Sequence, residues 1–204
     1  GYDLARRQAG AFGTLGLLLS VSLKVLPRPQ SERTLVFELD AATAVARCRA
    51  WARQPHPLTG ACHADGVLRV RLAGAPAAVD EATAALGGEP AASDYWDALR
   101  DHALDWFRSG GCLWRLSVPP AADPAGTDCL INWAGAERWC RTPPEGDAPA
   151  GMLARVAQAG GHARRFDATY GIQQPTGAAA VYVRGLKAAF DPACVLNPHL
   201  SPAD

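Results

Sequence analysis

The sequence predicts an α+β protein, and three observations support this. Its 204 residues are 49% apolar, which is ample for a hydrophobic core. Stretches with the alternation typical of strands and stretches with helical spacing follow one another along the chain. Turn residues, mostly glycine and proline, separate these stretches. The length fits one large domain or two small ones.

The first 27 residues are expected to form the end of a helix, a glycine-rich turn and a strand. Residues 2–8 have helical character, and the helix is expected to end at residues 10–13, which include Gly10 and Gly13. Residues 15–26 are apolar and alternate with polar residues in part, which predicts a strand. Pro27 and Pro29 end this strand, because proline has no N–H to donate to a sheet.

Residues 28–170 are expected to form a second unit in which strands and helices take turns. Two of the predicted strands, 129–133 and 137–141, are expected to form a hairpin. Asp40 and Ser93 are expected to cap the N-termini of two helices. The other predicted strands are 34–39, 67–72, 112–118 and 162–166, and the predicted helices are 41–53, 76–86, 93–107 and 148–159. Residues 171–204 add a helix at 178–189 and an irregular apolar end, which is expected to dock on the rest.

The charge excludes one class of partner. Twenty basic and twenty acidic residues leave no net charge, so the chain lacks the positive field that attracts phosphate backbones, and nucleic-acid binding is not expected. The longest apolar stretch, 15–26, is interrupted by polar residues and is shorter than the about 20 residues that span a bilayer. No membrane span and no signal peptide are therefore expected, and the protein is expected to be cytoplasmic.

The six cysteines are scattered and form no CxxC pair. Cysteines of this kind are usually buried thiols in a reducing compartment, so neither a zinc site nor a disulfide framework is expected. The histidines form no HxH or HxxxH pair, and a metal site is not expected from them either.

Three widely separated segments resemble one protein family. The opening GYDLARRQAGAFGTLGLLLSVSLKVLPRP is similar to the end of the FAD-binding domain in flavoproteins of the vanillyl-alcohol oxidase type. The closing LKAAFDPACVLNP resembles the C-terminal signature of that family. Between them, LWRLSVPP, INWAGAERWCRT and GGHARRF resemble the cap region of the FAD-binding E subunits of glycolate oxidases.

The resemblance covers nearly the whole chain and implies a role for each part. Residues 1–27 would be the C-terminal end of the FAD-binding domain. Residues 28–170 would be a ferredoxin-like α/β cap domain with an antiparallel sheet, on the substrate side. Residues 171–204 would be a C-terminal helix and tail that return to the FAD domain.

The glycine-rich turn is the first candidate cofactor site. Glycines let backbone N–H groups approach a ligand that a Cβ would block, but a tight helix-to-strand turn would need them too. The resemblance implies that this turn runs beside the adenosine diphosphate part of FAD. The candidates, best first, are then Gly13, Thr14, Gly16, Leu17, Ala11 and Tyr2.

Asn197 is the second candidate, because the resemblance places it near the flavin. Its amide offers a donor and an acceptor, which suits the edge of an isoalloxazine ring. The alternative is an asparagine that fixes a local turn before Pro198.

Oxidation of a 2-hydroxy acid by a flavin needs a base for the hydroxyl proton and a cation for the carboxylate. Arg115 is the candidate clamp, since a guanidinium pairs with both carboxylate oxygens; the alternative is an arginine on the solvent face of its strand. His162 is the candidate base or proton relay; the alternative is a histidine that is merely hydrogen-bonded at a strand start.

The expected function is that of an FAD-binding subunit in a glycolate oxidase complex. Such a complex oxidises glycolate to glyoxylate and passes electrons through FAD to its partners, a larger FAD subunit and an iron–sulfur subunit. Two alternatives stay open. The chain is a cap-domain fragment that acts as a structural or interaction module without binding flavin by itself, or it belongs to another FAD-linked 2-hydroxy-acid oxidase.

Overall fold

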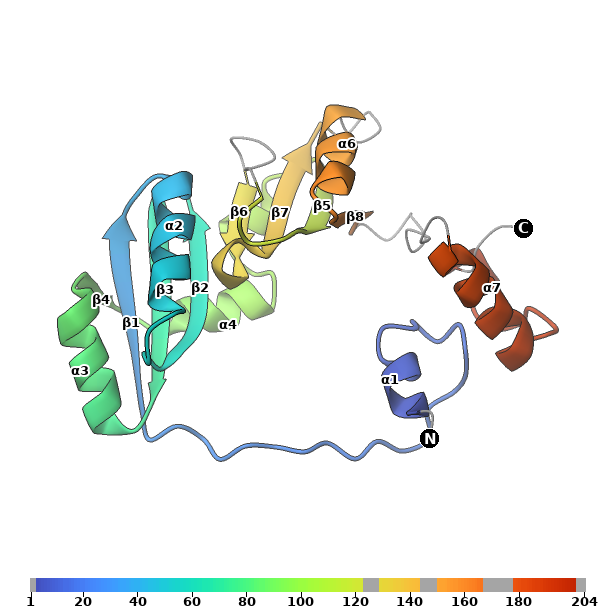
Figure 1. Ribbon diagram of the computed structural model, residues 1–204, viewed down its shortest axis with the longest axis horizontal. Coiled ribbons are helices and arrows are strands. Elements are labelled where there is room, and N and C mark those ends of the chain that lie inside the picture. The colour runs from blue at the N-terminus through green and yellow to red at the C-terminus, as the bar shows by residue number, and fades with distance from the viewer. Residues whose placement is uncertain (1–2, 123–128, 144–149, 167–177, 201–204) are drawn as a thin grey trace. The chain divides into compact units, whose positions relative to one another are not determined.

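The computed structural model describes residues 3–122, 129–143, 150–166 and 178–200 (Figure 1). Contacts divide the chain into two compact units. Unit 1 combines residues 1–26 with residues 167–204, and unit 2 consists of residues 27–166.

Unit 2 is built on an eight-stranded sheet in which every described pair of neighbours is antiparallel. The order of the strands is β4-β1-β3-β2-β6-β7-β5-β8. The strands are β1 (Ser31–Glu38), β2 (Leu58–Ala64), β3 (Val67–Gly74), β4 (Glu89–Ala91), β5 (Cys112–Ser117), β6 (Cys129–Asn132), β7 (Glu137–Thr142) and β8 (His162–Arg165). The mixture of helices with an antiparallel sheet confirms the predicted α+β class.

The sheet consists of two similar halves. In the first, β1, α2, β2, β3, α3 and β4 follow the βαββαβ order, and the sheet order is β4-β1-β3-β2. In the second, β5 to β8 occupy the matching order β8-β5-β7-β6. The halves meet where β2 pairs with β6, through the pairs Cys62–Asn132 and His63–Ile131.

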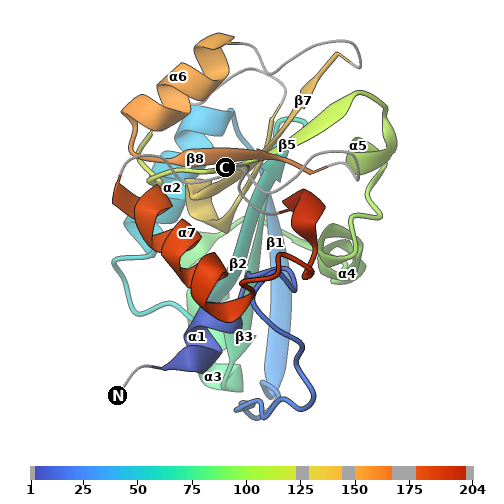
Figure 2. The ribbon, with the colours of Figure 1, turned by 90° about the vertical axis from the view of Figure 1, so that its right-hand side faces the viewer.

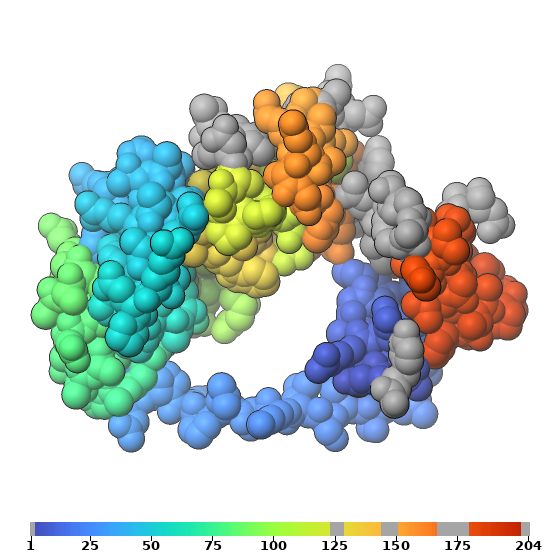
Figure 3. Space-filling model, viewed as in Figure 1, coloured from blue at the N-terminus to red at the C-terminus, as the bar shows by residue number. Residues whose placement is uncertain are grey.

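Helices cover both faces of this sheet. On one face lie α2 (Ala41–Trp51), α3 (Pro76–Leu86) and α6 (Ala150–Gln158), and on the other lie α4 (Asp94–Arg100) and α5 (Asp105–Arg108) (Figure 2). Figure 3 shows α2 in cyan and α6 in orange over the first of these faces. The alternation of β3 turns its leucines and valine toward α2 and α3, where Leu68, Val70 and Leu72 are fully buried.

Several helix ends and turns follow the sequence prediction. Asp40 caps α2 by accepting hydrogen bonds from the backbone N–H and the hydroxyl of Thr43, at 2.9 and 2.6 Å. Pro76 opens α3, and Gly87 ends it with a φ of +69°. Ser93 precedes α4 as predicted, but its side chain makes no capping bond.

The predicted helix at 93–107 is wrong in its middle. α4 ends at Arg100, α5 begins at Asp105, and His102 between them has a φ of +53°. The His102 ring stacks on Phe107 at 4.5 Å and meets Trp139 of the sheet edge-on at 4.7 Å. Ring packing against the sheet therefore overrides the helical spacing of these apolar residues. The strand β2 and the short strand β4 were not predicted.

The strand predicted at 15–26 is also wrong. The structure gives these residues no strand, and among the described residues they have no ladder partner. The side chains of Leu17, Leu19 and Leu26 are more than 80% exposed. Alternation alone does not make a strand, because its backbone needs a neighbouring strand for hydrogen bonds.

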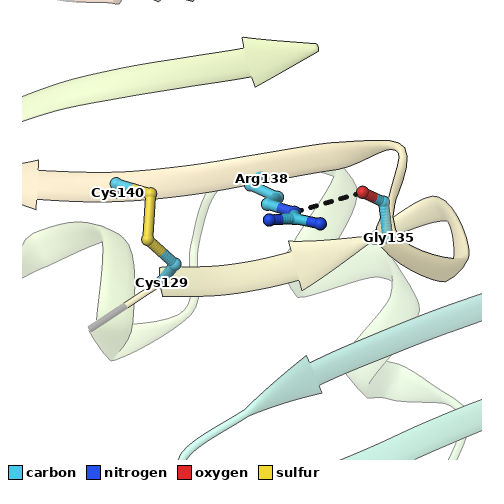
Figure 4. The surroundings of a disulfide bond; sticks show 4 residues. All are labelled: Cys129, Gly135, Arg138 and Cys140. Carbon is cyan, nitrogen blue, oxygen red and sulfur yellow. Dashed lines mark hydrogen bonds between the residues drawn. A yellow bond between two sulfur atoms is a disulfide. The ribbon is translucent and has the colours of Figure 1, made fainter. Parts of the chain in front are cut away.

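The expectation that every cysteine is a free thiol is wrong for one pair. Cys129 of β6 and Cys140 of β7 face each other across the hairpin and form a disulfide, with their Cα atoms 4.4 Å apart (Figure 4). Cα atoms come this close at the non-hydrogen-bonded sites of antiparallel pairs, which suits a cross-link. Cys48 and Cys62 are buried free thiols, as predicted.

Unit 1 contains α1 (Leu4–Gln8), α7 (Ala178–Phe190) and the short 3-10 helix η2 (Pro198–Leu200). Lys187 of α7 connects the two ends of the chain, because its ammonium donates to the carbonyl of Thr14 at 2.9 Å and to that of Leu196 at 2.8 Å. The apolar tail thus docks within this unit.

Candidate functional site

A cavity of about 480 Å³ lies in unit 2, on the face of the sheet that α4 covers. Strands from both halves of the sheet line it, together with α4, the His102 turn and the turn between β6 and β7. Gly60 of β2 permits part of this arrangement, since an added Cβ would lie 3.1 Å from the ring of Trp96. The cavity is large enough for a small-molecule ligand.

Arg115 lines this cavity and is held by a buried carboxylate. Its Nε and Nη2 both donate to Oε2 of Glu137, at 2.7 and 2.5 Å. Glu137 is 6% exposed, and its other oxygen accepts from Asn132 Nδ2 at 3.2 Å and Trp139 Nε1 at 2.9 Å. The guanidinium also lies between two indoles, 5.7 Å from the ring of Trp133 and 5.9 Å from that of Trp139.

Arg115 lies on the face of the sheet that carries the cavity. Its side chain is 37% exposed and faces the cavity rather than open solvent alone. Sequence reasoning missed Glu137, Asn132 and Trp139, which fix its position. The strict alternation of Glu137, Trp139 and Arg141 along the predicted strand was the available signal, because it places all three on one face.

Two further guanidinium groups line the cavity. Arg71 lies over the Trp96 ring at 5.3 Å and donates to the hydroxyl and carbonyl of Thr59, at 3.1 and 3.2 Å. Arg100 pairs with Asp97 at 2.8 Å. Among the described residues, Arg71 has no carboxylate partner.

The glycine-rich turn of unit 1 has a left-handed backbone at three neighbouring positions: Gly10 (φ +78°), Phe12 (+51°) and Gly13 (+69°). A Cβ on Gly13 would lie 2.9 Å from Nδ2 of Asn197. Glycine is therefore favoured at residue 13, both by its φ and by this close approach. Gly16 has no such φ, and an added Cβ would meet only the end of the Gln8 side chain, at 3.2 Å.

The two candidate cofactor segments come together in unit 1. Asn197 Nδ2 donates to the carbonyl of Phe12 at 2.8 Å, although 185 positions separate the two residues. Asn197 itself has a φ of +43°. Thr14 closes the turn, since its hydroxyl donates to the carbonyl of Ala11 at 2.6 Å. Among the described residues, no group accepts the backbone N–H of Gly13 or of Gly16.

Lys187 is a residue that sequence reasoning missed. Besides the two carbonyls, it pairs with Oδ2 of Asp191, and both side chains are buried. The hydrogen bond from Lys187, followed by those from the backbone of Leu196 and Val195, lowers the pKa of Asp191. The available signal was its rarity, because the chain has only two lysines among its 20 basic residues, together with the helical i, i+4 spacing to an aspartate.

The remaining candidates are dispersed. Ala11 is half-buried in the turn, and Leu17 is exposed beyond it. His162 is exposed at the start of β8, where it pairs with Ser117 of β5, and it does not line the cavity. Tyr2 lies outside the described residues. Within the described part of the chain, no three acidic, cysteine or histidine side chains cluster as a metal site would require.

Comparison with known proteins supports the resemblance that the motifs predict. The chain is 40% identical over 203 residues to the glycolate oxidase subunit GlcE of Escherichia coli (strain K12), which covers 97% of this chain. This chain is similar to a glycolate oxidase subunit. It spans 57% of the length of that relative. No protein-family model and no solved structure matches this chain. Across the described residues, no helix has the length and apolar character to cross a membrane.

Proposed function

We propose that this chain is part of an FAD-binding subunit of a complex that oxidises glycolate to glyoxylate. The observation that carries the proposal is the 40% identity with GlcE over nearly the whole chain. In this proposal, unit 2 is the cap domain on the substrate side, and unit 1 contributes to the FAD domain. Electrons pass to a larger FAD subunit and an iron–sulfur subunit in a cytoplasmic complex.

The turn and tail of unit 1 fit a nucleotide cofactor in three respects. Gly13 brings backbone to the surface without a Cβ, the N–H groups of Gly13 and Gly16 are free among the described residues, and Asn197 lies against the turn. Free N–H groups of this kind suit phosphate oxygens. When bound, FAD supplies the acceptor for a hydride from the substrate carbon. Gly13, Thr14, Gly16 and Asn197 would hold it, with Ala11 and Leu17 nearby, and the role of Tyr2 stays a prediction.

Arg115 is proposed to bind the substrate carboxylate. A charged guanidinium between two indoles, in a partly enclosed cavity, attracts an anion more strongly than one in open water. Glu137 fixes its direction but also competes for its donors, so a substrate carboxylate would use the side of Arg115 that Glu137 leaves open. His162 stays a prediction as proton relay.

The test uses the full-length protein in its complex. Arg115→Ala is expected to raise the Michaelis constant for glycolate by about tenfold or more, because a charge-assisted bond is lost. Arg49→Ala is the matched control, since Arg49 is exposed on α2 and does not line the cavity. If the Arg115 variant has the same kinetics as the control, Arg115 has a structural role and does not bind the substrate.

Flavin retention tests the cofactor assignment separately. Gly13→Ala is expected to lower the FAD content of the purified protein by more than half, because alanine is strained at this φ and its Cβ would strike Asn197. Asn197→Ala should lower it to a smaller extent. Gly185→Ala is the control, because a Cβ on this helical glycine meets nothing. Full flavin content in both variants, measured by absorbance, would favour the alternative of a structural module.

A further inference from the structure

The cavity of unit 2 is larger than its proposed substrate requires. A two-carbon acid has only five non-hydrogen atoms, whereas the cavity volume of about 480 Å³ lies in the range of pockets for drug-sized ligands. The volume left beside a bound carboxylate is lined by rings. Trp96, Trp133, Trp139, Phe166 and His102 all contribute to the wall.

Trp133 is placed in this wall at a conformational cost. Its φ is +49°, that of Ala134 is +53°, and both are left-handed values that residues other than glycine avoid. The indole is nevertheless 63% exposed, so burial of its own surface does not offset the cost. Strained backbone positions cluster at active sites and ligand clamps, and an aromatic ring offers a large apolar face for packing.

One guanidinium of the wall has no carboxylate partner among the described residues. Three guanidinium groups and two carboxylates line the cavity. Glu137 pairs with Arg115, and both Asp97 and the neighbouring Asp101 pair with Arg100. The third guanidinium belongs to Arg71, which the Trp96 ring and Thr59 hold in place.

We infer that this cavity binds carboxylic acids that carry a flat aromatic ring close to the carboxylate. Arg71 supplies the charge that attracts the acid, and Trp133 supplies the face on which the ring stacks. This inference rests on the proposed function in one respect: Arg115, which is proposed to bind the substrate carboxylate, lines the same cavity. An acid of this class would also fill the ring-lined volume that glycolate leaves empty.

The experiment measures equilibrium binding of two unreactive probes, phenylacetate and acetate, to the intact protein by titration calorimetry. Phenylacetate is expected to bind at least about tenfold more tightly than acetate. Trp133→Leu should weaken phenylacetate about fivefold and leave acetate within about twofold, because only the stacking contact is lost. A general loss of structure would instead weaken both acids.

The charge is tested with a matched pair on β3. Arg71→Gln should weaken both acids by about tenfold. Arg69→Gln is the control, because Arg69 lies over Tyr95 and does not line the cavity. Circular dichroism identifies a variant that has not folded. If the Arg71 variant is unfolded, the Trp133→Leu variant, which changes an exposed residue, tests the inference by itself. Equal affinity for the two acids, or no saturable binding of phenylacetate by about 10 mM, would overturn the inference.

Oxidation of glycolate, assayed in parallel, separates this inference from the proposed function. Turnover of glycolate without binding of phenylacetate would refute only the aromatic preference. Binding of phenylacetate without oxidation of any 2-hydroxy acid would refute only the proposed enzyme.

Discussion

At the scale of single residues, hydrogen bonds with several partners hold two buried charged side chains, those of Lys187 and Glu137. The three ammonium protons of Lys187 find three acceptors, on Thr14, Asp191 and Leu196. The two oxygens of Glu137 accept from Arg115, Asn132 and Trp139. A buried charge costs free energy unless it is paired and hydrogen-bonded, so both groups are tied to one geometry.

Lys187→Met should lower the melting temperature by about 5 °C or more at neutral pH, because Asp191 is left buried without its cation. The pKa of Asp191 is lowered in the folded protein. The stability that the charged Asp191 contributes is therefore present above pH 3.8, the pKa in the unfolded chain, and is lost as the pH falls through the folded-state pKa. The difference between wild type and variant should shrink below about pH 4.

Lys24→Met is the natural control, since Lys24 is the only other lysine and is exposed. Melting followed by circular dichroism between about pH 3 and pH 7 makes the comparison. A difference that is constant over this range would show that Asp191 is not the group responsible.

At the scale of elements, the β6–β7 hairpin is held by more than its hydrogen bonds. The disulfide joins residues 129 and 140, and the guanidinium of Arg138, which is 1% exposed, donates to the carbonyl of Gly135 (Figure 4). It also donates to the carbonyl of Ala122. Both contacts fix the turn that carries Trp133 and Glu137 to the cavity. The hairpin is thus the element on which the candidate site depends most.

Replacing Cys129 and Cys140 together by alanine should lower the free energy of unfolding by about 2–3 kcal/mol, the value expected for a cross-link that closes a short loop. Urea unfolding under non-reducing conditions measures it. Cys194→Ala, which removes an exposed free thiol, should change it by less than about 0.5 kcal/mol. Peptide mapping without reductant should recover residues 129 and 140 in one linked peptide; two free thiols would contradict the pairing.

At the scale of the whole molecule, the hydrophobic core of the described residues belongs to unit 2. The three hydrophobic clusters of buried residues lie entirely within residues 35–163, inside this unit. The bond between Lys187 and Thr14 lies inside unit 1. Unit 2 should therefore be stable by itself, as is expected of a domain that buries its own core.

Residues 27–166 expressed alone should accordingly fold and unfold in one cooperative transition, with a denaturant midpoint close to that of the same unit in the longer chain. Urea unfolding monitored by tryptophan fluorescence suits this test, because all six tryptophans lie in unit 2. A fragment that stays unfolded would show that the stability of unit 2 depends on residues outside 27–166.

The elements set by neighbouring residues could be predicted from the sequence. The cap at Asp40, the start of α3 at Pro76, the hairpin after residue 129 and the end of α7 before Asp191 depend on residues a few positions apart. Side-chain period and cap chemistry act over that range. The motifs also sufficed for the resemblance to a glycolate oxidase subunit, which the comparison confirmed.

Only the tertiary structure decided the contacts that make the sites. Arg115 meets Glu137 across 22 positions, Lys187 meets Thr14 across 173, and Asn197 meets Phe12 across 185. Whether residues 15–26 pair and whether residues 93–107 stay helical depends on which strand or ring lies beside them. Such contacts follow from strand register and chain topology, which bring together residues whose local patterns carry no information about each other.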